Sequence, residues 1–209
     1  MQTTPYPWPW DHPAGTPLTA DRLAVVVCGW QQYWALRVEA FGGIDAALAD
    51  LSATIAELRD LGATVLWVRT GAPSGPSRRP PHLPEWGTDD WELLSGPLPG
   101  DLVVDTPGLD AFLVEWTDLE LRSRGCDRLV VCGLGTEGPV SSTNRSANDR
   151  GYECLIPTDA VVHHDPTTGA ASLSSVCMSG GIFGAVGTAA DLISELRTNE
   201  LRTNEPQKD

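Results

Sequence analysis

Short runs of branched apolar residues alternate along this chain with longer segments of helical periodicity. The continuous apolar run over 23–28 is typical of a strand that is buried on both faces of a sheet. From Asp45 to Leu61, leucine and isoleucine recur every three to four residues, and Gly62 then supplies a common helix stop. This part of the chain therefore predicts a buried strand followed by an amphipathic helix.

The same alternation continues toward the C-terminus. We predict further strands at 64–68, 101–105, 128–132, 153–157 and 182–186, and further helices at 117–125, 139–150, 173–178 and 188–196. Thr117 and Glu120 form a capping-box pattern that predicts the start of one of these helices. Regular alternation favours an α/β fold, a three-layer α-β-α sandwich around a mostly parallel sheet of about six strands. Its crevice is expected at the carboxyl ends of the strands.

The chain divides into three parts by composition. Residues 1–20 carry Tyr6-Pro7-Trp8-Pro9-Trp10, which predicts an extended aromatic arm that covers an apolar surface of its own domain or of a partner subunit. Residues 21–196 hold the alternating pattern, with a proline- and glycine-rich loop over 70–100 that we expect to border a site or an interface. In 197–209 a duplicated five-residue motif matches no helical face and predicts a flexible, frayed tail.

Length, charge and cysteine content narrow the class of function. A chain of 209 residues is enough for one domain, and its formal charge of −14 disfavours nucleic acid and anionic membrane surfaces as partners. No apolar run approaches the roughly 20 residues that span a bilayer, and no export signal is recognised. The five cysteines are an odd number and mostly lie in apolar runs, which predicts reduced, buried thiols and a cytoplasmic location.

A glycine-rich segment, Gly133-Leu134-Gly135-Thr136-Glu137-Gly138-Pro139-Val140, follows the predicted strand at 128–132. It is typical of a tight turn from a strand into a helix. Pro139 suits the first helical position because its φ is fixed and its missing N–H would have no helical partner there. The turn is therefore suited to start a helix. A proline side chain has neither a nucleophilic nor an ionisable group, so Pro139 supplies no atom that could attack a substrate.

Several further motifs occur together between residues 6 and 194. They are Tyr6-Pro7-Trp8-Pro9, Gln31 after the first strand, Trp91-Glu92, Val104-Asp105 with Pro107-Gly108 and Ala111-Phe112, Thr117-Asp118-Leu119-Glu120-Leu121, and the segments 148–155 and 180–186. In this combination the chain resembles the isochorismatase-like cysteine hydrolases, and most closely the branch with biuret hydrolase and ureidoacrylate amidohydrolase. The resemblance implies the three-layer fold predicted above and hydrolysis of an amide or ureide as the family reaction, without a cofactor.

The resemblance also implies a catalytic Asp, Lys and Cys, in which the Asp is the base, the Cys attacks the carbonyl carbon and the Lys supports the charge balance. None of these side chains is present at the matching positions, where Gly29, Thr106 and Pro139 stand instead. A glutamine that resembles a substrate ligand in the biuret-type branch is replaced by Ser179. The resemblance therefore implies the scaffold of the family with its triad replaced.

Other residues near the predicted crevice offer substitutes for the missing groups. Cys28 ends the first strand and offers a thiol, but no Lys or His lies next to it in sequence to activate it, and a buried thiol is the favoured interpretation. Glu137 and Asp105 offer a pair of carboxylates for general acid and general base catalysis. Capping or solvated roles are favoured for both acids.

The histidines do not support a metal site. His163 and His164 are adjacent, and neighbouring residues of an extended segment point to opposite faces, so the two rings cannot easily bind one ion. His82 has no Asp-x-His companion, which separates this chain from the metal-containing nicotinamidase relatives. We expect no metal.

Three functional hypotheses follow. The first is a pseudoenzyme that acts as a structural or regulatory partner of an active amidohydrolase, in a homo-oligomer or in a hetero-oligomer with an active paralogue. The second is a repurposed enzyme, a lyase, cyclase or non-cysteine hydrolase of a small metabolite that uses the same crevice; a protein that binds or senses a small-molecule ligand is a third. The expected pocket residues are Cys28, Trp30, Asp105, Glu137, Gly138 and Ser179.

Overall fold

The computed structural model describes residues 18–39, 44–73 and 83–203. Within these ranges seven strands form one parallel sheet of order β3-β2-β1-β4-β5-β7, and the short β6 pairs with β4. The strands are β1 (Leu23–Cys28), β2 (Thr64–Thr70), β3 (Leu102–Thr106), β4 (Arg128–Leu134), β5 (Glu153–Pro157), β6 (Val161–Val162) and β7 (Ala185–Gly187). The predicted aromatic segment at 6–10, His82 and the end of the predicted tail lie outside the described residues.

The middle of the sheet is formed by β1 and β4, and every residue of both strands is buried. Val26 of β1 lies in register with Leu66 of β2 and with Val131 of β4. A strand with neighbours on both sides and helices over both faces has no solvent-exposed side, which explains the continuous apolar run at 23–28. The core of the molecule is centred on these two strands.

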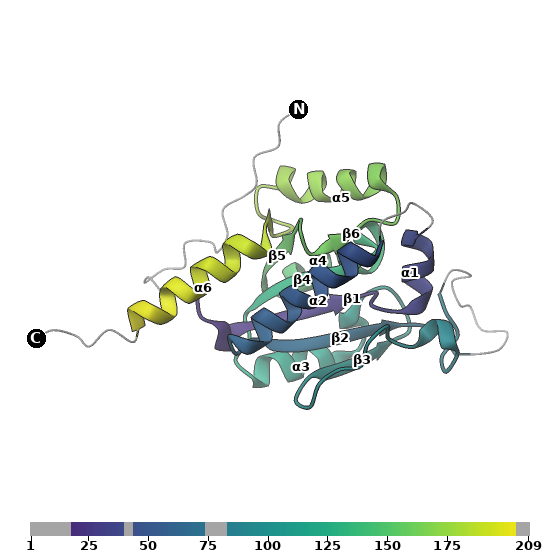
Figure 1. Ribbon diagram of the computed structural model, residues 1–209, viewed down its shortest axis with the longest axis horizontal. Coiled ribbons are helices and arrows are strands. Elements are labelled where there is room, and N and C mark those ends of the chain that lie inside the picture. The colour runs from purple at the N-terminus through teal and green to yellow at the C-terminus, as the bar shows by residue number, and fades with distance from the viewer. Residues whose placement is uncertain (1–17, 40–43, 74–82, 204–209) are drawn as a thin grey trace, which may run out of the picture.

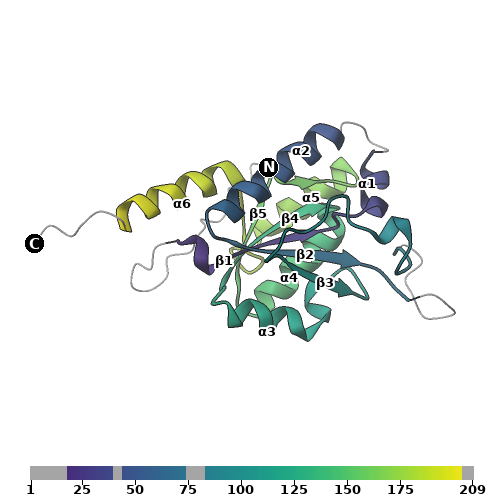
Figure 2. The same ribbon diagram turned by 60° about the horizontal axis from the view of Figure 1, so that its bottom comes forward.

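Six α-helices surround the sheet in the described part of the chain: α1 (Gln32–Glu39), α2 (Ile44–Asp60), α3 (Glu115–Ser123), α4 (Ser141–Asp149), α5 (Pro166–Met178) and α6 (Ala189–Thr203). Figures 1 and 2 show α2 and α6 on one face of the sheet and α3 and α4 on the other. On α2, Leu51, Ile55 and Leu58 are buried at helical spacing, as the periodicity predicts. The three-layer sandwich predicted from the sequence is confirmed.

The capping-box prediction at Thr117 is wrong. Helix α3 begins at Glu115, and Thr117 lies inside its first turn as a buried residue whose Oγ1 donates to the Ala111 carbonyl at 2.8 Å. This hydrogen bond fastens α3 to the 3-10 turn at Ala111–Leu113. The hydroxyl therefore makes a contact outside the helix, which the local pattern does not reveal.

The structure also corrects the predicted elements around α5. The helix predicted at 173–178 is only the last part of α5, which begins at Pro166 because the Asp165 side chain caps it by accepting from the Thr168 N–H. The strand predicted at 182–186 is mostly a turn, since Gly184 takes a left-handed φ of 82° and β7 begins only at Ala185.

Two further helices depart from the prediction. Helix α1, directly after the first strand, was not predicted, because Gln31-Gln32-Tyr33-Trp34 has no apolar repeat that marks a helix. Helix α6 continues to Thr203, so the first copy of the duplicated motif, at 195–199, and four of the five residues of the second, at 200–204, are helical where a frayed tail was expected from residue 197.

Asp101 joins three elements at the start of β3. Its carboxylate accepts from Arg59 Nε and Nη2 at 3.0 and 2.7 Å, from Trp67 Nε1 at 2.8 Å and from the Leu98 N–H at 3.0 Å. Burial alone would raise the pKa of Asp101, but the hydrogen bonds outweigh it and hold this pKa below its usual value. The carboxylate thereby ties α2 to the strands β2 and β3.

We expect Asp101→Asn to lower the free energy of unfolding at pH 7 by about 2 kcal/mol, because charge-assisted hydrogen bonds are lost. A carboxylate with a lowered folded-state pKa stabilises the fold above its ordinary pKa of about 4, and this contribution is lost as the pH falls through the folded-state pKa. Urea unfolding at pH 7 and at pH 3 measures both effects. The difference between wild type and variant should shrink at pH 3, and an equal difference at both pH values would contradict this role of Asp101.

Candidate functional site

The candidate site lies at the carboxyl ends of β1 and β4, where the crevice was predicted. Strand β1 ends at Cys28, and Gly29 follows with a left-handed φ of 64°. After β4, residues Thr136–Val140 form a short π-helical segment, so α4 begins at Ser141 and not at Pro139 as predicted. A Cβ placed on Gly29 would lie 3.2 Å from Pro139 Cγ. The fold therefore brings together the two positions that the family resemblance assigns to the base and the nucleophile.

The backbone leaves no room for a side chain at Gly29. A Cβ there would stand 2.4 Å from the Leu134 carbonyl oxygen, and the φ of 64° is itself unfavourable for any residue with a Cβ. Gly133 is packed as closely, because its Cβ would lie 1.9 Å from the Cys28 carbonyl oxygen. The ends of β1 and β4 thus meet backbone to backbone.

Thr106, the third position that the family resemblance assigns to the triad, ends β3 and is fully buried. Its Oγ1 donates to the Asp110 carbonyl at 2.7 Å. The Asp110 carboxylate in turn accepts from Ser146 Oγ on α4 and from the Phe112 N–H. Thr106 therefore fastens the loop after β3, which α4 holds from its other side, and presents no cation to the crevice.

The Cys28 thiol is fully buried beside Thr143 and Asp110. Burial raises the pKa of Cys28 to about 12; a hydrogen bond with Thr143 opposes this shift, and the negative charge of Asp110 adds to it. A thiol with this pKa is protonated at neutral pH and is a poor nucleophile. The structure therefore favours the buried-thiol interpretation of Cys28 over the catalytic one.

The Trp34 side chain fills the space over the turn after β4. Its ring atoms would lie 3.1 Å from a Cβ on Gly135 and 3.5 Å from a Cβ on Gly138. The indole is 8% exposed, and its Nε1 donates to Thr70 Oγ1 at 2.9 Å. Gly138, expected as a pocket residue, thus lies beneath an indole that is anchored to β2.

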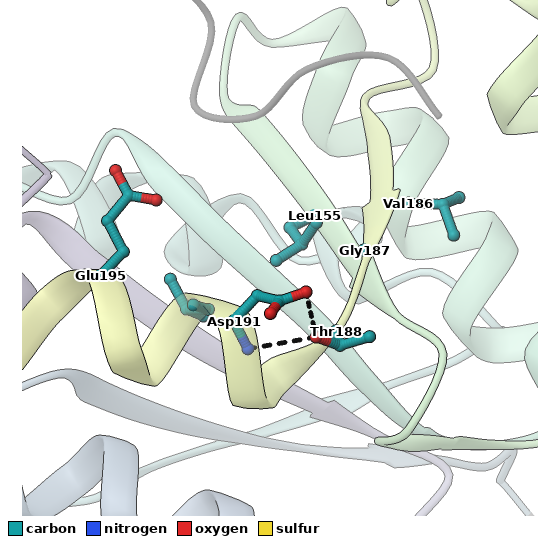
Figure 3. Close-up of a pocket in the computed structure, with 7 residues that line it drawn as sticks. Leu155, Val186, Gly187, Thr188, Asp191 and Glu195 are labelled. Carbon is teal, nitrogen blue, oxygen red and sulfur yellow. Dashed lines mark hydrogen bonds between the residues drawn. The ribbon is translucent and has the colours of Figure 1, made fainter. Parts of the chain in front are cut away.

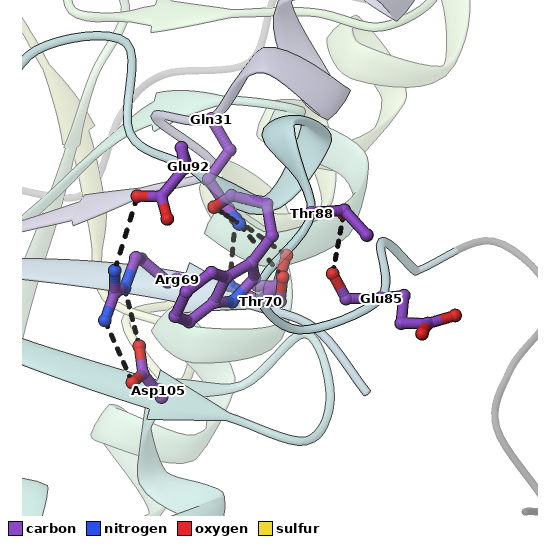
Figure 4. Close-up of polar contacts among 8 residues, drawn as sticks. Gln31, Arg69, Thr70, Glu85, Thr88, Glu92 and Asp105 are labelled. Carbon is purple, nitrogen blue, oxygen red and sulfur yellow. Dashed lines mark hydrogen bonds and ion pairs between the residues drawn. The ribbon is translucent and has the colours of Figure 1, made fainter. Parts of the chain in front are cut away.

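Trp30 and Gln31 fasten a loop to the sheet at the same edge. Trp30 is buried and donates from Nε1 to Ser95 Oγ at 2.9 Å, so it is a packing residue where a pocket residue was expected. Gln31 donates from Nε2 to the carbonyl oxygens of Thr70 and Trp91, at 3.0 and 2.7 Å, and its Oε1 accepts from the Thr70 N–H (Figure 4). The loop predicted to border the site is therefore tied to the ends of the strands.

Arg69, near the end of β2, was not singled out in the sequence. It makes a two-point contact with Asp105 of β3, with Nε–Oδ1 at 2.6 Å and Nη2–Oδ2 at 3.0 Å, and it lies 3.7 Å from Glu92 (Figure 4). Its guanidinium also stacks 3.8 Å from the centre of the Trp91 ring. The sequence feature that could have identified Arg69 is the presence of an arginine in an otherwise apolar strand. Asp105, expected in the pocket, is thus engaged by a cation.

Glu137 connects the turn to α5. Its carboxylate accepts from the backbone N–H groups of Asp165 at 2.7 Å and His164 at 3.2 Å. Asp105 is held by Arg69 instead, so the alternative of a catalytic pair of Glu137 and Asp105 is not supported: each acid has its own partners. The favoured capping role of Glu137 agrees with these contacts, because the two N–H groups precede the first turn of α5.

The two adjacent histidines have different partners, as expected for an extended segment. His163 Nδ1 lies 2.8 Å from Thr136 Oγ1, and His164 Nδ1 lies 3.8 Å from the Glu137 carboxylate. Among residues 18–39, 44–73 and 83–203, no group of three His, Cys, Asp or Glu side chains is arranged to hold a metal ion. In the same ranges no helix has the length and apolar character needed to cross a membrane.

Ser179, expected as a pocket residue, caps the end of α5. Its Oγ donates to the Val176 carbonyl at 2.8 Å and accepts from the Phe183 N–H at 3.1 Å. This pair of hydrogen bonds turns the chain out of the helix, so the side chain has a local structural role.

The described cavities lie away from this turn. One of about 150 Å³ is formed by β5, β7 and the start of α6, and the carboxylates of Asp191 and Glu195 line it (Figure 3). A second, of about 660 Å³, runs along α3, and a third, of about 390 Å³, runs along α6. None of these three cavities is lined by Gly29, Thr106 or Pro139.

Comparison with known proteins agrees with this architecture. A family model described as Isochorismatase domain matches residues 23–191. Ureidoacrylate amidohydrolase RutB of Azorhizobium caulinodans is 28% identical over 206 residues, which cover 83% of this chain and 90% of the relative. Ureidoacrylate amidohydrolase RutB of Variovorax paradoxus is 30% identical over 176 residues, which cover 72% of this chain and 69% of the relative.

Solved structures show the same fold. A cysteine hydrolase from Pseudomonas syringae pv. phaseolicola 1448A is similar with a TM-score of 0.72 and 22% identity, covering 95% of this chain and 99% of that one. At this identity the likeness concerns the arrangement of strands and helices alone.

We expect Gly29→Ala to lower the free energy of unfolding by about 3 kcal/mol, because the new Cβ adds a close contact with the Leu134 carbonyl to the strain of a left-handed backbone. Gly62→Ala is the matched control, since Gly62 has a φ of 98° and nothing within 4 Å of its Cβ position. Chemical denaturation should show a loss of only about 1 kcal/mol for this control. Equal losses for both variants would contradict the close packing of β1 against β4.

We expect iodoacetamide at pH 8 to leave Cys28 unmodified in the folded protein, because burial raises the pKa of this thiol to about 12 and removes it from solvent. Peptide mass spectrometry after a short exposure measures the labelling. The same reaction in guanidinium chloride, where all five cysteines are accessible, is the control. Rapid labelling of Cys28 without denaturant would show that this thiol is available for chemistry after all.

Proposed function

Since the chain belongs to the isochorismatase family, we propose that it is a non-catalytic member of that family which serves as a structural or regulatory partner of an active amidohydrolase. The chain has the hydrolase fold of the family, and the resemblance carries the catalytic base, cation and nucleophile to Gly29, Thr106 and Pro139. In this role the chain supplies a folded scaffold, and another chain carries out the hydrolysis.

Pro139 is the observation that carries this proposal. Thiol chemistry on this scaffold needs a nucleophile close to a helix N-terminus, where the amide groups lower its pKa and bind the oxyanion. Pro139 is buried, and it packs against the backbone position of Gly29. The Cys28 thiol does not replace the missing nucleophile, because it is buried and protonated. A chain without an attacking atom at this turn supports the non-catalytic role.

The packing around the turn supports the same conclusion. The Trp34 indole packs against Gly135 and Gly138, so protein atoms occupy the space directly over these two residues of the turn. The named relatives are ureidoacrylate amidohydrolases, and we therefore assign an amide or ureide substrate to the active partner. In this proposal the present chain contributes a rigid surface next to that partner.

One contact favours a second function, a repurposed hydrolase without a catalytic cysteine. Thr136 Oγ1 lies 2.8 Å from His163 Nδ1, and a hydroxyl beside an imidazole is the arrangement that activates serine and threonine nucleophiles. Thr136 is only 1% exposed, so this chemistry would require the turn to open. Such an activity would depend on both side chains.

We expect the purified full chain to release no ammonia from ureidoacrylate, biuret, nicotinamide or N-carbamoyl amino acids. An active family member is assayed in parallel with glutamate dehydrogenase as the coupling enzyme. Turnover by the wild-type chain would overturn the proposal. If that turnover disappeared in both Thr136→Val and His163→Gln, the repurposed hydrolase would take its place.

The partner role is tested by co-expression with a family member of the same genome that retains the catalytic Asp, Lys and Cys. We expect the two chains to elute as one complex in size-exclusion chromatography. The kcat or the thermal midpoint of the amidohydrolase should also differ from that of the amidohydrolase alone. If every such paralogue eluted separately and kept its kinetics, the partner role would be excluded.

A further inference from the structure

Of the three cavities described above, the groove along α3 is the largest, with a volume of about 660 Å³. Sites for small molecules have volumes of roughly 300–1,000 Å³. Figures 1 and 2 show α3 at the outer side of the molecule. The α3 groove, as we call it, has cationic, acidic and large apolar side chains in its wall: Glu115, Trp116, Asp118, Leu119, Arg122 and Arg150.

The apolar part of the wall lies on one face of α3. Trp116 is 40% exposed and Leu119 is 70% exposed, and Arg122 follows three residues further on. Side chains at this spacing are neighbours on the surface of a helix. The helix rises by about 9 Å from Trp116 to Arg122, at about 1.5 Å per residue. This face therefore has room for an aromatic ring on the indole and for a short chain that reaches the arginine end.

Arg150 carries its positive charge without a carboxylate beside it in the part of the chain that the structure describes. Its Nη1 and Nη2 donate to the carbonyl oxygens of Ser146 and Phe112, each at 3.1 Å, and its guanidinium lies 5.1 Å from the centre of the Phe112 ring. These neutral partners fix the position of the guanidinium and leave its charge uncompensated. Two of its five N–H donors are used in this way, so the others can bind a ligand.

Other arginines of the same chain do have acidic partners. Arg59, Arg69 and Arg128 each contact a carboxylate oxygen, at 2.7, 2.6 and 3.3 Å. The chain has 28 Asp and Glu residues against 14 Lys and Arg residues, so acids are in excess. An arginine held only by neutral groups at the wall of a groove is therefore suited to a carboxylate that the ligand supplies.

The remaining charges make the two ends of the α3 groove different. Arg122 donates from Nη2 to the Arg150 carbonyl at 2.7 Å and from Nε to Asp118 at 3.1 Å. Asp118 also accepts from the Tyr152 hydroxyl at 2.8 Å, so its charge is engaged. Glu115, in the first turn of α3, has no such partner among the described residues. An anionic group is consequently repelled at the Glu115 end and attracted at the Arg150 end.

We propose that the α3 groove binds a small organic acid that has an aromatic ring and a carboxylate on a short chain. The carboxylate pairs with Arg150, and the ring stacks on Trp116 beside Leu119. A guanidinium that is already held in position loses little conformational entropy on binding. None of Gly29, Thr106 and Pro139 lines this groove, so the inference is independent of whether the chain hydrolyses amides.

Titration of the ¹⁵N-labelled full chain with 3-phenylpropionate, followed by NMR, tests the proposal. We expect a saturable shift of the Trp116 indole N–H signal, which Trp116→Phe identifies among the eight tryptophans. Arg150→Gln should weaken binding by about 10-fold or more, because the charge that pairs with the carboxylate is lost. Raising NaCl from 50 to 500 mM should weaken binding to the wild-type chain as well.

Arg145→Gln is the matched control. Arg145 also lies on α4 and has no carboxylate beside it among the described residues, since it donates to Ser175 Oγ at 3.2 Å and stacks 4.0 Å from the centre of the Phe183 ring. It lines none of the three cavities. This variant loses the same charge from the chain and should bind 3-phenylpropionate as the wild type does.

The neutral analogue 3-phenylpropionamide provides a test on the wild-type chain, which needs no substitution. It should bind about 10-fold more weakly than the acid or not at all. Equal binding of acid and amide would overturn the proposal, and so would equal weakening by Arg150→Gln and Arg145→Gln. A Trp116 signal that does not move at 20 mM 3-phenylpropionate would overturn it too, including the case in which only a peptide ending in phenylalanine with a free carboxylate binds.

Discussion

The close approach of β1 and β4 at their carboxyl ends determines the form of the candidate site. Gly29 has a left-handed backbone, and a Cβ at this position would meet the Leu134 carbonyl at 2.4 Å. The turn after β4 is consequently held against β1, and the Pro139 ring completes the packing between them. A carboxylate at position 29 would force the two strand ends apart. The packing of this chain therefore leaves no space for a carboxylate side chain at position 29.

Polar contacts then close the space beside this packed turn. Trp34 reaches over the turn and is anchored by Thr70, while Gln31 binds both the end of β2 and the loop that carries Trp91. Arg69 pairs with Asp105 on the neighbouring strand. Hydrogen bonds of this kind are strengthened when they are shielded from water, so the buried members of the network resist opening. At this edge of the sheet the hydrogen bonds tie the loop to the strand ends, while the buried Trp91 Nε1 is left without a hydrogen-bond partner.

The same turn is connected to the outside of the molecule through Glu137. Its carboxylate binds the backbone immediately before α5. The turn that contains Pro139 is therefore one hydrogen-bonded contact away from this outer helix.

The sequence by itself determined the layered fold, because continuous apolar runs separated by helical repeats have few stable arrangements other than a parallel sheet between helices. It also determined that Gly29, Thr106 and Pro139 supply no base, cation or nucleophile, since no geometry gives these side chains such groups. Only the tertiary structure decided that Thr117 is a buried tether, that Glu137 and Asp105 have separate partners, and that Trp34 packs against Gly135 and Gly138. These outcomes depend on contacts between residues far apart in the chain, which neither local propensity nor periodicity encodes.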